Sequence, residues 1–174
     1  MISRSRFCLN IKLTDKCNLR CRYCPNIHGD RVTKKEHIDT AVRWYERNKD
    51  QLEHFYFEFS GGEVTQALDV LEYAFSVVPS DVIVKVITNG TTTKSKRVQD
   101  LFARNAERMM LVVSVDGDER SHDANRVTKD EGGGSYALID FEFLFSQKWW
   151  SLTASVVATL NNVENLADRV KWLY

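Results

Sequence analysis

Apolar residues recur at two spacings along the chain, and the two spacings alternate. Residues 7–13 alternate apolar and other positions, which is the period of a strand with one well-buried face. After a loop, apolar positions recur at helical spacing down to about Asn48. Thr33 and Glu36 form a capping-box pattern just before them, which predicts where this helix begins. The first part of the chain therefore predicts one strand, loop and helix.

Four more units of the same kind follow. Their predicted strands read "HFYFEFS", "VIVKVIT", "MMLVVSV" and "LTASVVATL". Helical spacing follows each strand: from Leu68 to Val78 before Pro79, through Val98 to Phe102, from about Tyr136 to Gln147, and from a cap at Asn161 to Glu164 onward. Five strand–helix units in series imply a parallel sheet covered by helices, and thus an α/β fold.

The strands are almost wholly apolar, which favours burial on both faces and suits either a β/α barrel or a doubly wound sheet. Periodicity does not separate the two. The unusual residues, in "CNLRCRYC", "GGE", "NG" and "DG", each fall just after a predicted strand. Because ligands bind at the carboxyl ends of parallel strands in both architectures, we expect one site there.

Composition narrows the class of protein. Lys plus Arg is 24 and Asp plus Glu is 24, so the chain lacks the basic excess typical of phosphate binding, and nothing indicates a nucleic-acid partner. No leader pattern and no apolar run of about 18 residues is present, which predicts a cytoplasmic protein without membrane contact. In that reducing compartment, four cysteines predict metal ligands or thiols rather than disulfides.

Cys17, Cys21 and Cys24 lie within eight residues and allow three interpretations. With His28 they form a Cys3His set for structural zinc. Cys21 and Cys24 alone have the spacing of a redox dithiol, which leaves Cys17 without a role. The third interpretation is an iron–sulfur cluster whose fourth iron stays open to a substrate or cofactor. Cys8 sits in the first strand and is interpreted as a small buried filler.

The motif CxxxCxxC after a first strand, here "CNLRCRYC", resembles the signature of the radical S-adenosylmethionine (radical SAM) superfamily. The resemblance implies a partial (βα) barrel of the radical SAM type, with about five βα units present. It also implies a 4Fe–4S cluster on Cys17, Cys21 and Cys24, with S-adenosylmethionine on the open iron. Reductive cleavage would yield a 5′-deoxyadenosyl radical that abstracts hydrogen from substrate.

Further segments match the family in order and imply the cofactor-binding residues. "GGE" resembles the motif after the second strand that binds the methionyl amino group, and "SVDG" with "HDANR" resembles the fourth-strand segment of the peptide-maturase and sulfatase-maturating (SPASM-type) branch. An arginine there offers two parallel donors to a carboxylate. The implied cofactor-binding residues are Tyr23, Gly61, Gly62, Glu63, Asn89, Ser114, Asp116 and Arg126.

The same resemblance implies the partners. A peptide or protein substrate and an external electron donor such as flavodoxin or ferredoxin are expected. Substrates of nucleotide or RNA type, activation of another enzyme, and a non-catalytic zinc-stabilised binding module are the alternatives. Residues 1–174 are interpreted as one core domain that is truncated at its carboxyl end, with a missing region or a partner covering the fifth strand; an inactive fragment is the alternative to an active enzyme.

Overall fold

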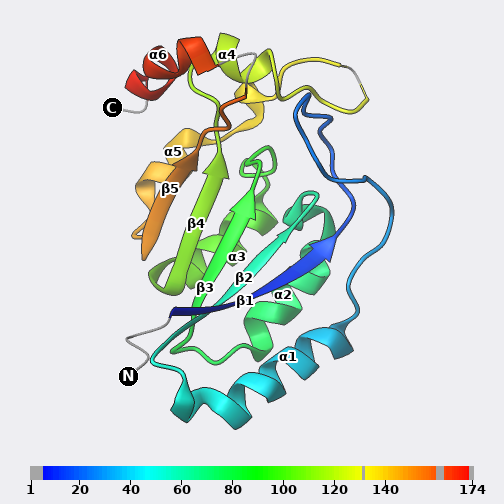
Figure 1. The fold of residues 1–174 in the computed structure, drawn as a ribbon, viewed down its shortest axis with the longest axis vertical. Helices are drawn as coiled ribbons and strands as arrows, with labels where there is room; N and C mark the ends of the chain where they lie inside the picture. The colour runs from blue at the N-terminus through cyan, green and yellow to red at the C-terminus, as the bar shows by residue number, and fades with distance from the viewer. Residues whose placement is uncertain (1–5, 131, 160–162, 173–174) are drawn as a thin grey trace.

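The computed structural model describes residues 6–130, 132–159 and 163–172, and its centre is one parallel sheet (Figure 1). The strands are β1 (Arg6–Thr14), β2 (His54–Gly61), β3 (Ile83–Thr88), β4 (Met109–Ser114) and β5 (Ser151–Ser155). They lie in the order β1-β2-β3-β4-β5, and every neighbouring pair is parallel. The five predicted strands are therefore confirmed, although β5 ends earlier than its apolar run.

Helices connect the strands in sequence. They are α1 (Lys35–Asn48), α2 (Leu68–Val77), α3 (Lys96–Asn105), α4 (Glu119–Asp123), α5 (Phe141–Ser146) and α6 (Leu166–Lys171). Figure 1 shows α2 and α3 behind the sheet, on one of its faces. A doubly wound sheet reverses its strand order at a switch point, and this sheet does not. The sequential order is that of a partial β/α barrel, as predicted.

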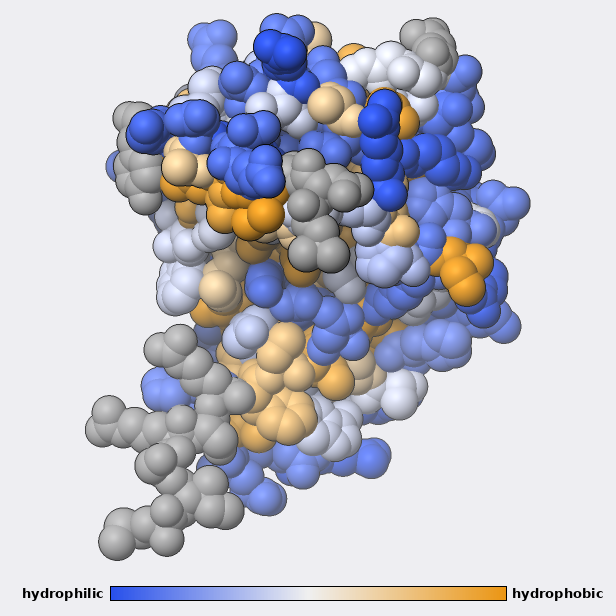
Figure 2. All heavy atoms as spheres, turned by 45° about the horizontal axis from the view of Figure 1, so that its top comes forward, coloured by the Kyte–Doolittle hydropathy of each residue, from blue (hydrophilic) through white to orange (hydrophobic). Residues whose placement is uncertain are grey.

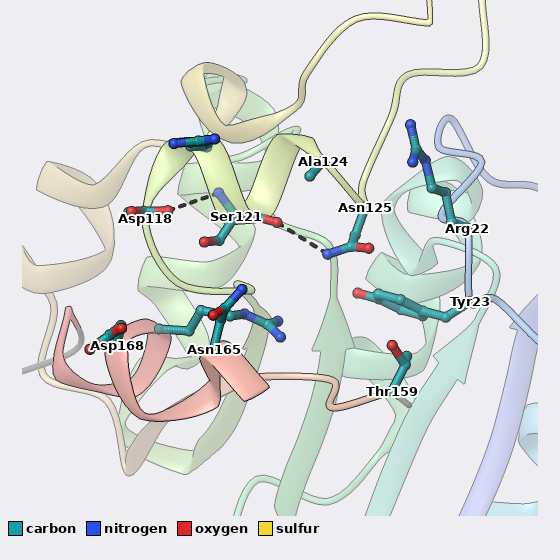
Figure 3. Close-up of a pocket in the computed structure, with 11 residues that line it drawn as sticks. Arg22, Tyr23, Asp118, Ser121, Ala124, Asn125, Thr159, Asn165 and Asp168 are labelled. Atoms are coloured by element: carbon teal, nitrogen blue, oxygen red, sulfur yellow. Dashed lines mark hydrogen bonds between the residues drawn. The ribbon is translucent and has the colours of Figure 1, made fainter. Parts of the chain in front are cut away.

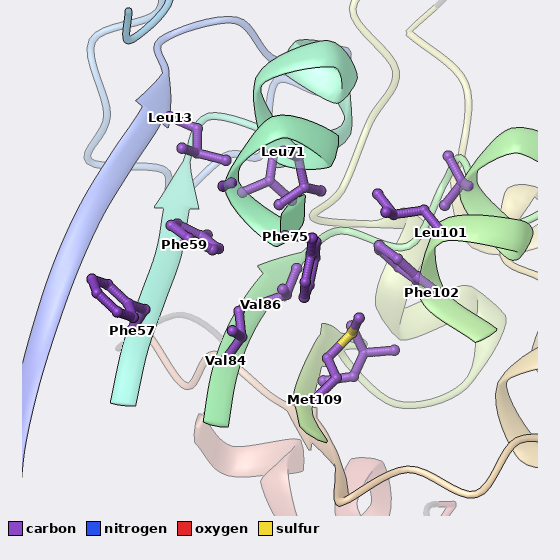
Figure 4. Close-up of a cluster of buried hydrophobic side chains, with 14 of the residues drawn as sticks. Leu13, Phe57, Phe59, Leu71, Phe75, Val84, Val86, Leu101, Phe102 and Met109 are labelled. Atoms are coloured by element: carbon purple, nitrogen blue, oxygen red, sulfur yellow. The ribbon is translucent and has the colours of Figure 1, made fainter. Parts of the chain in front are cut away.

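The core lies between the sheet and its helices (Figure 4). Leu13, Phe57, Phe59, Val84 and Val86 are fully buried and alternate along their strands. The intervening residues are only partly buried, so the expected burial of both faces is wrong for the described residues. Charged side chains on the second face of the sheet explain this difference.

On the second face, Glu58 of β2 forms an ion pair with Lys85 of β3 at 2.8 Å. These two charged side chains sit in register on neighbouring strands and neutralise each other. The apolar pattern did not indicate a polar face, because Glu58 and Lys85 are each a single charge inside an otherwise apolar strand. The open face is therefore mixed in polarity rather than a second dry core.

Helix α1 begins at Lys35, close to the predicted start but not through the predicted capping box. Lys34 is the N-cap residue and makes no side-chain capping hydrogen bond. The Thr33 hydroxyl instead donates to the Lys12 carbonyl oxygen at 2.7 Å. Thr33 therefore ties the loop to β1, and this tertiary contact competes with the local cap.

The helix predicted from Tyr136 to Gln147 is divided. A short 3-10 turn covers Tyr136–Leu138, and α5 starts only after Asp140. The Asp140 carboxylate accepts a hydrogen bond from the Phe143 amide at 2.9 Å, which caps α5 and fixes its start. The five-residue α4 was not predicted, and the predicted cap at Asn161 lies outside the described residues.

Within the described ranges, none of the helices has the length and apolar character needed to cross a membrane.

Candidate functional site

The predicted motifs meet at the carboxyl edge of the sheet. The cysteine loop follows β1, "GGE" begins at the last residue of β2, Asn89 follows β3, and Ser114 is the last residue of β4. Neighbouring parallel strands end at the same edge, so this convergence follows from topology. Ser114 is half-buried and paired with Ser155 of β5.

Main-chain hydrogen bonds hold the cysteine loop against the chain after α4; we call these bonds the loop pairing (residues 18–22 with 125–129). The Arg20 amide donates to the Val127 carbonyl at 2.8 Å, and the Arg22 amide donates to the Asn125 carbonyl at 2.9 Å. Leu19 is fully buried beneath this pairing. The pairing places "HDANR" beside the cysteines, although about a hundred residues separate them in the sequence.

Gly61 and Gly62 allow the end of β2 to lie very close to the main chain of residues 14–16. A Cβ on Gly61 would lie 2.5 Å from the Thr14 carbonyl oxygen, and one on Gly62 would overlap the Lys16 carbonyl oxygen. The Gly62 amide donates to that Thr14 oxygen at 2.8 Å. The two glycines are therefore required for β2 to approach the segment that leads into Cys17.

Glu63 points into the protein and is 1% exposed. Its Oε2 accepts from the Asn89 amide at 2.6 Å, and its Oε1 accepts from the Thr65 amide at 3.1 Å and from the hydroxyls of Thr65 and Thr88 at 2.7 Å each. Burial raises the pKa of Glu63, while these hydrogen bonds act in the opposite direction. As placed, this carboxylate joins the ends of β2 and β3 rather than facing the cysteines.

The side chain of Asn89 is also hydrogen-bonded within the protein, mostly to its own loop. Its Oδ1 accepts from the Thr91 amide and hydroxyl, and its Nδ2 donates to Asn18 Oδ1 at 3.0 Å. The same Nδ2 lies 4.0 Å from Cys17 Sγ. Asn89 thus belongs to the wall of the cysteine loop.

Asp116 is fully buried, and its carboxylate is the common partner of groups from several segments. The Tyr23 hydroxyl donates to its Oδ2 at 2.5 Å, and the Val157 amide donates to Oδ1 at 3.2 Å. Two guanidinium groups approach the same carboxylate, Arg126 Nε at 3.3 Å and Arg169 Nη2 at 3.7 Å. Asp116 thus links the cysteine loop, α6 and the chain beyond β5, with no exposed face of its own.

Arg126 connects Asp116 to the cysteines. Its guanidinium lies 5.4 Å from the centre of the Tyr23 ring, and its Nη1 lies 3.9 Å from Cys21 Sγ. Its Nε is buried without a hydrogen bond. Arg169, which no sequence signal singled out, is 3% exposed and likewise keeps a buried nitrogen, Nη1, without a hydrogen bond. Two arginines with spare donors therefore border the site.

All four cysteines are free. Burial raises the pKa of the Cys21 thiol to about 11 and also raises the pKa of Cys17. A metal bound by these thiols would therefore displace their protons. Among the described residues, no three His, Cys, Asp or Glu side chains converge on a single metal ion.

The chemistry of the donor set fits a 4Fe–4S cluster. Three half-buried thiols come from one short non-helical loop, and each sulfur faces a nitrogen donor, two from the loop itself and one from Arg126. A multi-iron cluster is bound by thiolates that stand further apart than the ligands of one ion. Arg126 adds a positive charge beside the negatively charged thiolates that such a cluster requires.

A hollow of about 730 Å³ opens beside this site, between α4, α6 and the cysteine loop (Figure 3). Tyr23, Ser121, Asn125 and Thr159 border it, and Figure 3 shows the Tyr23 ring along one side. Its volume lies in the usual range for small-molecule sites. Figure 2 looks toward this end of the molecule, where hydrophilic side chains predominate.

His122 is fully buried and braces the segment that carries Arg126. The Ser135 hydroxyl donates to the Arg126 carbonyl at 2.7 Å, so it accepts from His122 Nε2 at 2.9 Å. The Asp116 amide then donates to Nδ1 at 3.4 Å. With its hydrogen on Nε2 and its lone pair on Nδ1, His122 links the segment that holds Asp116 to the segment that holds Arg126.

This burial predicts a pH effect on stability, because it lowers the pKa of His122 to about 4. The unfolded chain takes up the proton below about pH 6.5 and the folded chain only below about 4, so stability falls as the pH falls between these values. The full loss is roughly 3 kcal/mol at 1.36 kcal/mol per pKa unit. Urea unfolding from pH 7 to 4 should show a flatter profile for His122→Gln than for the control His37→Gln at an exposed position. Parallel profiles would contradict the prediction.

Comparison with known proteins gives a consistent family. The family described as the Radical SAM superfamily matches residues 11–138, which is more than half of the chain. A probable GTP 3′,8-cyclase from Pyrococcus abyssi is 37% identical over 87 residues, which cover 48% of this chain and 27% of the cyclase. The matched stretch is therefore a minor part of that relative.

Solved structures share the fold. A structure of anSMEcpe with bound AdoMet and the Cp18Cys peptide has a TM-score of 0.76 at 23% identity, covering 97% of this chain and 48% of that one. A structure of Streptococcus suis SuiB bound to the precursor peptide SuiA has a TM-score of 0.70 at 18% identity, covering 97% and 37%. This chain thus spans less than half of either solved chain.

Proposed function

Because the chain belongs to the radical SAM superfamily, we propose that it is the core of an enzyme that abstracts hydrogen from a peptide or protein substrate. Its cofactors are a 4Fe–4S cluster and S-adenosylmethionine, as in the rest of the superfamily. When bound, they supply a 5′-deoxyadenosyl radical through one-electron cleavage of S-adenosylmethionine. The observation that carries the proposal is the loop pairing, which brings Arg126 next to Cys21 and to the Tyr23 ring of the cysteine loop.

The residues of this chain are assigned as follows. Cys17, Cys21 and Cys24 hold the cluster through their thiolates. Arg126 binds the methionyl carboxylate with its Nη donors, while its Nε stays 3.3 Å from the Asp116 carboxylate, since a guanidinium can serve two anions at once. Tyr23 packs against the adenine at the wall of the hollow.

The other predicted cofactor-binding residues receive more limited roles. Gly61 and Gly62 offer main-chain groups to the methionyl amino group, close to the entry of the cysteine loop. Ser114 contacts ribose or carboxylate oxygens. Glu63, Asn89 and Asp116 act from inside the protein, because their side chains are buried and already hydrogen-bonded.

Support for a peptide substrate comes from the anSMEcpe and SuiB structures compared above, each of which contains a bound peptide. A nucleotide is the second candidate, because the curated relative is a probable GTP 3′,8-cyclase. A flavodoxin or ferredoxin remains the proposed electron donor in the cytoplasm. Further chain or a partner is proposed to pair with the edge of β5 that no other described strand covers, since an open strand edge exposes main-chain groups.

The test is anaerobic reconstitution of the protein with iron and sulfide, followed by dithionite and S-adenosylmethionine. We expect about four irons per chain, as a 4Fe–4S cluster requires, and release of 5′-deoxyadenosine. Synthetic peptides that contain cysteine, as the Cp18Cys peptide of the similar structure does, should raise this release, whereas GTP should not. Bound zinc without sulfide would contradict the enzyme and support the zinc-stabilised module. Stimulation by GTP alone would contradict the peptide substrate.

A further inference from the structure

Each thiol of the cysteine loop faces a different nitrogen donor. Cys17 Sγ lies 3.4 Å from the Leu19 amide nitrogen, and Cys21 Sγ lies 3.9 Å from Arg126 Nη1. Cys24 Sγ lies 3.5 Å from His28 Nε2. The third donor, His28, is also the histidine of the Cys3His interpretation, in which it would be a zinc ligand.

The position of the proton on His28 follows from its second neighbour. Arg20 Nη1 makes a short contact with His28 Nδ1. A guanidinium has only donors, so Nδ1 must be the acceptor. A neutral imidazole then carries its hydrogen on Nε2. That nitrogen therefore points its N–H at Cys24 and has no lone pair to offer a metal.

A hydrogen bond to a cluster sulfur has a defined electronic effect. The reduced cluster carries one more negative charge than the oxidised one, so a donor on a thiolate stabilises the reduced state more strongly. Such a donor raises the reduction potential of the cluster. Arg20 adds to the effect by fixing which nitrogen of His28 donates.

We propose that His28, oriented by Arg20, is a positioning residue that donates a hydrogen bond from Nε2 to the Cys24 thiolate and thereby raises the reduction potential of the cluster. His28 is not a ligand. The inference rests on the proposed assignment of the three cysteines as cluster ligands.

The test is an electron paramagnetic resonance redox titration of the reconstituted protein without substrate. His28→Leu removes the donor, and we expect a more negative midpoint potential with unchanged iron and sulfide content. His28→Gln supplies an amide donor and should restore part of the shift. The matched control is His37→Leu, at an exposed position in α1, which should leave the potential unchanged.

A second variant addresses the role of Arg20. Arg20→Met leaves His28 in place but removes the group that fixes its tautomer, so a smaller shift in the same direction is expected. An Arg20→Met potential equal to that of the wild type would overturn this part of the inference.

The outcomes separate the inference from the proposed function. Wild-type protein that assembles no iron–sulfur cluster would refute the proposed function itself. If wild type carries the cluster and cleaves S-adenosylmethionine, an unshifted His28→Leu potential would overturn only the role of His28. Loss of iron from His28→Leu would identify His28 as a ligand and would also overturn it.

Discussion

Replacing Cys21 with alanine is expected to abolish the cluster and, with it, the release of 5′-deoxyadenosine. Cys21 supplies one of the three proposed thiolates; Cys17 and Cys24 supply the other two, and Cys8 lies on β1 against Glu58. Iron and sulfide should fall from about four of each per chain to below about one. Chemical iron and sulfide assays and product chromatography measure the two effects.

Cys8→Ala is the matched control for this experiment. Cys8 is also a free, partly buried thiol, but it lies on β1 with its Sγ 4.0 Å from Glu58 Oε2. Its removal should leave both iron content and product release near the wild-type level. A Cys21→Ala protein with a full cluster would show that the loop does not supply the ligands in the proposed way.

The second large effect is expected at Glu63. Glu63→Ala removes the acceptor of the buried Thr65 and Asn89 amides, and each unpaired buried donor costs about 1–3 kcal/mol. The free energy of unfolding of the protein without cofactors should therefore fall by about 2–6 kcal/mol. Urea unfolding measures this change. Glu63→Gln keeps one carbonyl acceptor and should cost less.

Glu53→Ala is the control, because Glu53 is exposed, and its effect should stay within about 0.5 kcal/mol. The comparison decides between two roles of the "GGE" carboxylate. A Glu63→Ala protein as stable as Glu53→Ala, but with weakened S-adenosylmethionine binding, would identify Glu63 as a direct cofactor contact. A loss of stability in the absence of the cofactor identifies it as the brace between β2 and β3.

Local sequence patterns were sufficient for the strands and for the edge at which the motifs gather. Alternation in residues 7–13 predicted β1, and glycine and cysteine motifs after strands predicted their convergence, because both depend only on period and topology. Helix α4 was missed because five residues held by an Asp118 cap show no apolar period. The Thr33 cap was wrong because Lys12 competes for the hydroxyl.

Contacts between distant segments could not be predicted in the same way. Arg169 reaches Asp116 across 53 positions, and His122 finds Ser135 only once the chain after α4 folds back. A single sequence contains no signal for such pairs, since neither period nor motif spacing specifies which loops meet. The inward direction of Glu63 was missed for the same reason, because its partners follow a different strand.

The loop pairing has a consequence for divergence within the superfamily. It is made of peptide groups, so the identities of Arg20, Arg22, Asn125 and Val127 do not enter its hydrogen bonds. Substitutions can therefore accumulate at those positions of both segments whose side chains have no other role, while the backbone keeps its course. This is one physical route by which a chain only 23% identical to a solved protein still follows it with a TM-score of 0.76.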